Sequence, residues 1–168
     1  MMKRWIRFAA ILSLLAFAAG CPYTTKVPLG SPDRHLFDSR LLGEWTAVDA
    51  ESDSALIRVY AFNDSEYYIE ASEAGEEPDR YRAFPFSLGG GRFLQVNELG
   101  RESAAHEYIF ARYELSESGE LTIRFVGEDC VPTGLAEDTK ALRAFIAAHV
   151  DDPALDDEGS ELVLKKRT

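Results

Sequence analysis

The sequence has few of the residues that build catalytic or metal sites. Of its 168 residues only two are cysteine and three are histidine. It has no G-x-S-x-G, H-E-x-x-H or C-x-x-C motif and no phosphate-binding P-loop. No spacing of carboxylates indicates a catalytic pair. The sequence therefore predicts a protein that is not an enzyme, with no catalytic residues, no metal ligands and no cofactor.

Positive charge is also scarce. The chain has 18 Lys and Arg residues against 29 Asp and Glu residues, a net charge of −11. An acidic surface repels phosphate backbones, which argues against a nucleic-acid partner. Hydrophobic residues make up 46% of the chain, enough for the core of one domain. Beyond the first 20 residues no apolar stretch is long enough to cross a bilayer, which excludes a polytopic membrane protein.

The N-terminus has the pattern of an export signal. Lys3, Arg4 and Arg7 form a positive region, and an apolar run over residues 8–19 follows it. This run is short for a transmembrane span, which needs about 20 apolar residues. An uncleaved single-pass anchor is the alternative interpretation, but the small residues after the run favour cleavage.

Cys21 comes directly after the small residues Ala18-Ala19-Gly20. This ending resembles a bacterial lipobox, and the resemblance implies a signal peptide over residues 1–20 and a lipid anchor on Cys21. Because Pro22 stands where Asp marks retention in the inner membrane, the resemblance also implies an outer-membrane anchor with the domain in the periplasm. Residues 21–38 are predicted to be the lipidated cysteine and a flexible tether, with a reach of roughly 20 Å for about 15 residues.

Cys130 is the second cysteine. If the lipid occupies Cys21, no partner is left for an intramolecular disulfide. Cys130 lies beside Glu128 and Asp129, whose negative charges disfavour a reactive thiolate. The sequence therefore predicts a packed, structural cysteine.

Residues 39–168 are predicted to form one all-β, mainly antiparallel domain. Runs of alternating apolar and polar residues recur between turn residues, which is typical of a barrel or sandwich. Asp138–Val150 has helical spacing instead, with Asp138 and Thr139 as candidates for the N-cap. The sequence thus predicts eight strands with one helix before the last strand. The expected strands cover residues 41–48, 54–62, 66–71, 80–88, 92–97, 105–115, 120–127 and 161–166.

Gly43-Glu44-Trp45 stands in the first predicted strand. This G-x-W motif before an antiparallel meander resembles the lipocalins and the wider calycin group. The resemblance implies an up-and-down barrel in which Trp45 closes one end and stacks on an arginine from a late strand, Arg124 or Arg167. The second lipocalin motif, Thr-Asp-Tyr, is absent, and lipocalins carry their helix after the eighth strand.

Three segments together resemble uncharacterised bacterial lipoproteins. These segments are Leu41–Trp45, the Gly-Gly turn and strand at residues 89–94, and the end of the helix near Asp152–Leu155. This resemblance implies the same lipocalin-like domain and no specific function. The apolar stripe of the helix is expected to cap one mouth of the barrel.

Two polar clusters are predicted to be structural. His106-Glu107 resembles half of a metal or acid–base site, but His35 and His149 lie far from it in the sequence. The acid-rich stretch Asp151–Glu158 lacks the ligand order of a calcium loop and is interrupted by Pro153, which favours a solvated loop.

An eight-stranded barrel is wide enough either to be filled by side chains or to hold one small ligand. Two functions therefore stay open: a membrane-anchored protein that binds a small hydrophobic or amphipathic ligand, and an interaction module that contacts another envelope protein. The first predicts a cavity of roughly 300 Å³ or more, the second a filled barrel and an exposed apolar patch. The candidate ligand contacts are the aromatic residues Tyr60, Phe62, Tyr67, Phe84 and Phe86.

Overall fold

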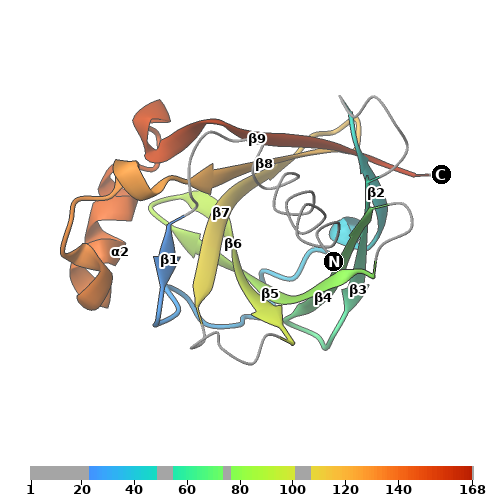
Figure 1. Ribbon diagram of the computed structural model, residues 1–168, viewed down its shortest axis with the longest axis horizontal. Helices are drawn as coiled ribbons and strands as arrows, with labels where there is room; N and C mark the ends of the chain where they lie inside the picture. Colours follow the sequence, from blue (N-terminus) through green and yellow to red (C-terminus); the bar gives the residue numbers. More distant parts are fainter. Residues whose placement is uncertain (1–22, 49–54, 74–76, 101–106, 168) are drawn as a thin grey trace, which may run out of the picture.

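The computed structural model describes residues 23–48, 55–73, 77–100 and 107–167. Eight antiparallel strands form a closed barrel, in which each strand pairs with the next and β9 pairs back with β2 (Figure 1). The predicted eight-stranded up-and-down barrel with one helix before the last strand is confirmed. The barrel strands are β2 (Gly43–Ala47), β3 (Ala55–Ala61), β4 (Tyr67–Glu73), β5 (Asp79–Leu88), β6 (Gly91–Leu99), β7 (Tyr108–Leu115), β8 (Glu120–Val126) and β9 (Asp156–Lys166).

The helix α2 (Thr139–Ala148) lies in the connection between β8 and β9, together with the 3-10 turns η3 (Glu128–Cys130), η4 (Leu135–Glu137) and η5 (Pro153–Leu155). Asp138 caps it as predicted, because its carboxylate accepts a hydrogen bond from the backbone N–H of Ala141 at 3.0 Å.

The expectation that the helix caps a mouth of the barrel is wrong. α2 packs on the outer wall, beside the β5–β6 hairpin (Figure 1). A Cβ on Gly89, whose φ is +61°, would lie 2.6 Å from the carbonyl oxygen of Ala147, so this turn needs glycine both for its backbone and for helix packing.

Alternation of side chains along the strands creates two separate cores. The inner core fills the part of the barrel around Trp45. The outer core lies between the outer wall of β5–β7 and α2. The inner core consists of Leu41, Trp45, Val59, Tyr67, Ala83, Leu94, Tyr113, Leu121 and Leu164. The outer core consists of Tyr23, Leu29, Phe86, Phe93, Phe110, Val126, Val131, Leu142, Ile146, Val150 and Leu155.

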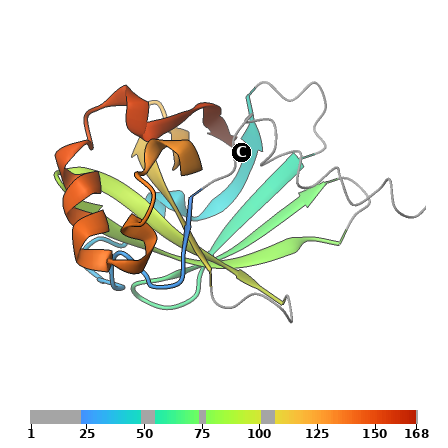
Figure 2. The same ribbon diagram turned by 60° about the vertical axis from the view of Figure 1, so that its left-hand side comes forward.

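The chain from Tyr23 to Gly30 is packed onto the barrel, so the expectation of a flexible tether is wrong for this stretch. The short strand β1 (Thr24–Thr25) pairs with the part of β7 that β8 leaves uncovered, and the N–H of Tyr23 donates to the carbonyl of Val126 at 2.9 Å. Figure 2 shows this segment and α2 on the same side of the barrel. Tyr23 and Leu29 fill the outer core, which a sequence pattern without periodicity does not reveal.

A buried glutamine fixes the same segment. Gln95, fully buried on the outer wall of β6, accepts a hydrogen bond from the N–H of Leu29 at 2.7 Å. Its amide also donates to the carbonyl of Ile109 at 3.3 Å. Because a buried polar group is stable only when it is bonded, Gln95 ties the N-terminal segment to this wall specifically.

The last strand is longer than predicted. β9 begins at Asp156 and not at Glu161, so the second half of the acid-rich stretch is strand and not solvated loop. The reason is that the Asp156 carboxylate pairs with the Arg112 guanidinium of β7, which also donates to the carbonyl of Val150.

Candidate functional site

The inside of the barrel contains an apolar cavity of about 150 Å³. All eight barrel strands and the 3-10 turn η2 (Ser39–Leu41) contribute to it. The volume is below the roughly 300 Å³ expected for a typical ligand pocket, so it has room for a smaller group. The lining residues are Leu41, Trp45, Ile57, Val59, Tyr67, Ile69, Ala71, Ser72, Tyr81, Leu94, Val96, Ile109, Ala111, Leu121, Ile123, Phe125, Leu162 and Leu164.

One end of the barrel is closed by residues Phe37–Leu42, which we call the plug. Leu41 is buried and reaches the cavity, and the ring of Phe37 stacks on that of Tyr67 at 4.7 Å between centroids. The cyan turn of η2 lies within the ring of strands in Figure 1. At the opposite end β2, β4 and β6 finish and β3, β5 and β7 begin, and the connections between them (residues 49–54, 74–76 and 101–106) lie outside the described residues.

Trp45 connects the plug to the barrel. Its indole N–H donates to the carbonyl of Leu41 at 2.9 Å, and the side chain is 1% exposed. The Nζ of Lys166 lies 5.4 Å from the ring centroid, within cation–π distance. The role that the lipocalin resemblance assigns to Arg124 or Arg167 therefore falls to Lys166, whereas Arg124 pairs with Glu161.

Gly43 of the G-x-W motif also has a structural explanation. Its φ is +127°, in the region that favours glycine, and a Cβ at this position would lie 2.8 Å from Cε of Lys166. The glycine therefore allows Lys166 to pass over the start of β2 and reach Trp45.

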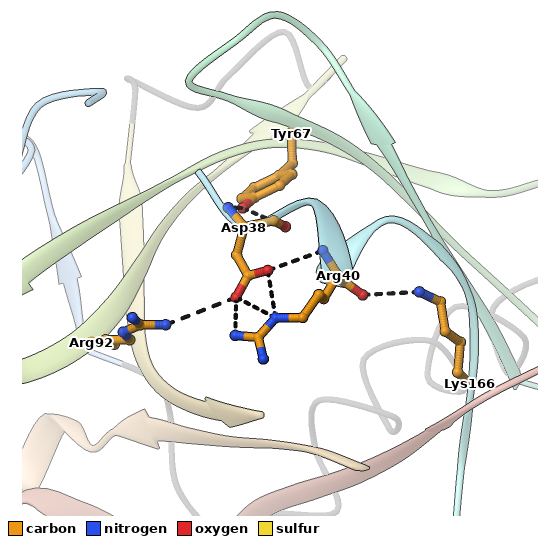
Figure 3. Close-up of polar contacts among 5 residues, drawn as sticks. All are labelled: Asp38, Arg40, Tyr67, Arg92 and Lys166. Carbon is orange, nitrogen blue, oxygen red and sulfur yellow. Dashed lines mark hydrogen bonds and ion pairs between the residues drawn. The ribbon is translucent and has the colours of Figure 1, made fainter. Parts of the chain in front are cut away.

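Asp38 organises the polar side of the plug (Figure 3). Its carboxylate accepts from Arg40, with an ion-pair distance of 2.6 Å, and lies 3.8 Å from Arg92. The Tyr67 hydroxyl accepts from the N–H of Asp38 at 2.8 Å and donates to its carbonyl at 3.2 Å. Burial raises the pKa of Tyr67 to about 12, so this hydroxyl stays neutral. Lys166 completes the network by donating to the carbonyl of Arg40 at 2.9 Å.

The plug is expected to loosen in acid. The hydrogen bonds from Arg40 hold the pKa of Asp38 below its usual value, against the opposing effect of burial. A carboxylate whose pKa is lower in the folded state stabilises the fold above its unfolded pKa of about 4, and this stabilisation is lost as the pH falls below that value. The unfolding free energy, measured in urea between pH 6 and 3, should therefore fall less steeply in Asp38→Asn than in the wild type. An equal pH dependence in both proteins would contradict this account.

Of the five aromatic residues predicted to contact a ligand, only Tyr67 lines the cavity. Tyr60 and Phe62 lie on the outer wall, where they are 47% and 52% exposed. Ala83 faces the inside of the barrel, and Phe84 and Phe86 lie on the other face of β5. Phe86 belongs to the outer core. The sequence analysis missed most of the cavity because its walls are mainly aliphatic.

The exposed rings of Tyr60 and Phe62 and the half-buried ring of Tyr68 form a patch on the outer wall, at β4 and the end of β3. The rings of Tyr60 and Tyr68 lie 6.1 Å apart, and the guanidinium of Arg82 lies 4.5 Å from the ring centroid of Phe62. Arg82 also pairs with the buried carboxylate of Glu66 at 2.6 Å. Aromatic rings beside arginine are common at protein interfaces.

A second, more polar groove of about 570 Å³ lies at the rim of the plug end. Its walls include Arg92, Arg112 and Tyr113. The guanidinium of Arg112 is already bonded to Asp156 and to the carbonyl of Val150. Although this groove is larger, the interior cavity is the better candidate site because it is apolar and lies within the barrel.

Within the described residues, the histidines and the cysteine considered in the sequence analysis do not come together in a site. His149 ends α2 and bonds to the carbonyl of Phe145, His35 is exposed, and His106 lies outside the described residues. Cys130 is half-buried in η3. Within the described ranges no three His, Cys, Asp or Glu side chains come together as metal ligands. No helix in this part of the chain is long and apolar enough to cross a bilayer.

Comparisons with models of protein families, with curated proteins and with solved structures give no match to this chain. The fold itself, a closed up-and-down barrel of eight strands, is consistent with the calycin-like group.

Proposed function

We propose that this protein is a non-enzymatic lipoprotein of the cell envelope that binds a short hydrocarbon group inside its barrel. The observation that carries the proposal is the apolar cavity of about 150 Å³, closed at one end by the plug. An apolar cavity of about this volume in another protein stays free of water and binds benzene, a molecule of six carbons.

The cavity favours hydrocarbon and not a polar ligand. Among the described residues that line it, only Trp45, Ser72, Tyr67 and Tyr81 have polar side-chain atoms, and the indole N–H of Trp45 is bonded to the carbonyl of Leu41. The hydroxyl of Ser72 donates to the carbonyl of Leu56 at 3.4 Å, and the hydroxyl of Tyr67 is bonded to Asp38 of the plug. A ligand with a polar group deep inside would lose hydrogen bonds to water and find few in return.

The proposed anchor would hold the barrel near the membrane. Cys21 precedes Tyr23 by two residues, so its Cα lies at most about 7 Å from that of Tyr23. Because Tyr23 is packed in the outer core, the chain available for a tether is much shorter than the sequence pattern indicates. By the lipobox resemblance we assign the anchor to the outer membrane and the barrel to the periplasm.

The proposal predicts how affinity depends on chain length. Each CH₂ group that enters the cavity should strengthen binding about fourfold, equivalent to about 0.8 kcal/mol, because it leaves water. For 1-alkanols from four to ten carbons, this gain should stop near six carbons, when the cavity is full. The measurement is an NMR titration of the full chain expressed with Cys21→Ser, which should shift signals of the lining residues.

The matched variants lie on the same strand. Val96→Phe places a ring in the cavity and should weaken hexanol binding about tenfold or more, whereas Leu99→Phe changes an exposed residue of β6 and should leave it unchanged. Equal binding by both variants, or shifts confined to the outer wall, would refute an interior site.

A second candidate function is a protein–protein interaction module. The exposed rings of Tyr60 and Phe62, beside the half-buried Tyr68, and the small size of the cavity favour it. If no alkanol binds, cross-linking in the envelope should capture one discrete partner, and Phe62→Ser should abolish that product. Loss of capture in Leu99→Ser instead would assign the contact to a different surface.

A further inference from the structure

The outer wall of the barrel exposes two aromatic rings beside a buried ion pair. Tyr60 and Phe62, at and just after the end of β3, are 47% and 52% exposed, whereas Glu66, just before β4, is 6% exposed. Burying an ion pair contributes little to stability and often lowers it. A wall that served only to close the barrel would bury the rings and expose the carboxylate, so this arrangement indicates a surface with a second role.

Glu66 holds the guanidinium of Arg82 in one position. Its carboxylate accepts hydrogen bonds from Nε of Arg82 at 2.9 Å and from a terminal nitrogen at 2.6 Å, and a third from the side-chain amide of Asn63 at 2.5 Å. The guanidinium thereby lies 4.5 Å from the ring centroid of Phe62. A guanidinium has more N–H groups than this fork uses, so Arg82 can also donate to a ligand. Because these groups are fixed in advance, few side chains would have to be ordered on binding.

The tyrosine rings and Arg82 form a row across three neighbouring strands. In the sheet register Tyr60 stands opposite Tyr68, and Tyr68 stands opposite Arg82. The rings of the two tyrosines lie 6.1 Å apart. Because neighbouring strands are about 4.8 Å apart, the row spans about 10 Å along the wall. Tyr60, Phe62 and Tyr68 lie toward the plug end, where the connection between β3 and β4 at residues 62–66 is described.

We propose that this surface, formed by Tyr60, Phe62, Tyr68 and Arg82, binds a neutral oligosaccharide. The C–H groups on the face of a sugar ring are slightly positive and the face of an aromatic ring is slightly negative, so the two pack together. The hydroxyl groups at the edge of the sugar accept hydrogen bonds from the remaining N–H groups of Arg82. The rings thus supply the stacking surface, and Arg82 supplies the hydrogen bonds beside it.

The charges around the rings favour a neutral ligand. Arg82, Arg58 and Arg80 are each paired with a glutamate, at 2.6, 2.9 and 4.0 Å. The described part of this wall therefore has no unpaired arginine to select an anion, and the guanidinium beside Phe62 repels a cation. The same ion pairs make the surface less suited to a protein partner, because the cores of protein interfaces are depleted of charged residues.

The surface lies on the side of the barrel away from the proposed anchor. In the ring of eight barrel strands β3 lies opposite β7, which pairs with β1. Figure 1 shows β1 and α2 on one side of the barrel and β3 and β4 on the other. If Cys21 carries the lipid, two residues before Tyr23, the exposed rings face away from the anchor and are accessible to a saccharide chain beyond the membrane surface.

The test is an NMR titration of the full chain with Cys21→Ser, using two uncharged probes, chitotetraose and maltotetraose. At least one of them should shift the signals of Tyr60, Phe62 and Tyr68. Its monosaccharide should bind about tenfold more weakly, because a single sugar covers one aromatic ring and not the row. The affinity should stay within about twofold when the salt concentration is raised, because salt screens only charged groups.

Single substitutions on the surface of the barrel assign the contact. Phe62→Ala should weaken tetrasaccharide binding about tenfold, because it removes a stacking surface. Val27→Ala changes an equally exposed residue of the N-terminal segment and should leave binding unchanged. Tyr60→Phe keeps the ring and should bind within about twofold of the wild type, whereas Tyr60→Ala should lose about fivefold.

Three results would overturn the inference. The first is that neither tetrasaccharide shifts the signals of the rings, and the second is that Val27→Ala weakens binding as much as Phe62→Ala. The third is that the shifts are confined to residues that line the cavity. If no saccharide binds and Phe62→Ser abolishes the cross-linked product, the surface belongs to a protein partner instead. The hydrocarbon site is tested separately by the 1-alkanols, so either proposal can fail without the other.

Discussion

Replacing Trp45 by alanine should lower the free energy of unfolding by about 3–5 kcal/mol, the usual cost of removing a large buried aromatic side chain. We expect a cost of this size because the indole is 1% exposed and adjoins an existing cavity, so that its removal enlarges a void. The change also removes the hydrogen bond to Leu41 that holds the plug. Urea unfolding followed by circular dichroism measures the difference.

Trp45→Phe is the matched control for this prediction. It keeps most of the ring but loses the N–H donor, so the expected cost is about 1–2 kcal/mol. A Trp45→Ala protein that is destabilised by no more than the phenylalanine variant would show that the plug is held by other contacts. The contacts of Lys166 and Tyr67 with Asp38–Arg40 would then be the first to consider.

Replacing Arg112 by methionine should cost about 3 kcal/mol of stability. Arg112 joins β7 to the first residue of β9 through Asp156, and to the end of the α2 segment through the carbonyl of Val150. Both ionised side chains are largely buried, with 18% and 14% exposure, so removing one leaves the other without its partner. The measurement is again the unfolding free energy in urea.

Arg124→Met is the control, because Arg124 stands opposite Arg112 in the register of β7 and β8. Arg124 pairs with Glu161 and Glu114, which are 50% and 72% exposed, so its loss should cost no more than about 1 kcal/mol. Comparable losses in the two variants would mean that the Arg112–Asp156 pair does not hold the start of β9.

The two stability predictions concern opposite faces of the barrel wall. Trp45 belongs to the inner core and holds the plug through Leu41, and Arg112 fixes the connection that carries α2. Because Val96 packs against the inner core, the unfolding free energy of Val96→Phe, measured in the same way, must accompany its hexanol titration to separate a loss of binding from a loss of stability.

Much of the fold was predictable from local patterns. Alternation at Ala55–Ala61 and Tyr67–Glu73, the turn at Gly89-Gly90, and the helical spacing after Asp138 depend on residues close together in the chain. These patterns give eight strands and one helix, and the structure confirms both. The G-x-W motif also indicated correctly that Trp45 lies at a closed end.

The candidate site was not predictable to the same degree. Alternation in β5 separates Phe84 and Phe86 from Ala83, but it does not say which set faces the inside of the barrel. The larger aromatic residues were expected inside, and the structure places them outside, in contact with or beside the outer core. Only Tyr67 among the predicted ligand contacts lines the cavity.

The sequence by itself determined which residues share a strand face and which residue caps α2, because both depend on residues close together in the chain. It also determined the acidic character of the chain, which follows from composition alone. Tertiary structure alone decided that Tyr23 and Leu29 pack on the barrel, that Asp156 pairs with Arg112, and that Lys166 reaches Trp45. The contacts of Asp156 with Arg112 and of Lys166 with Trp45 join residues far apart in the chain. Tyr23 and Leu29 pack their apolar side chains on a distant part of the barrel wall. Their free energy depends on which surfaces meet once the barrel has closed, and no local period in the sequence contains that information.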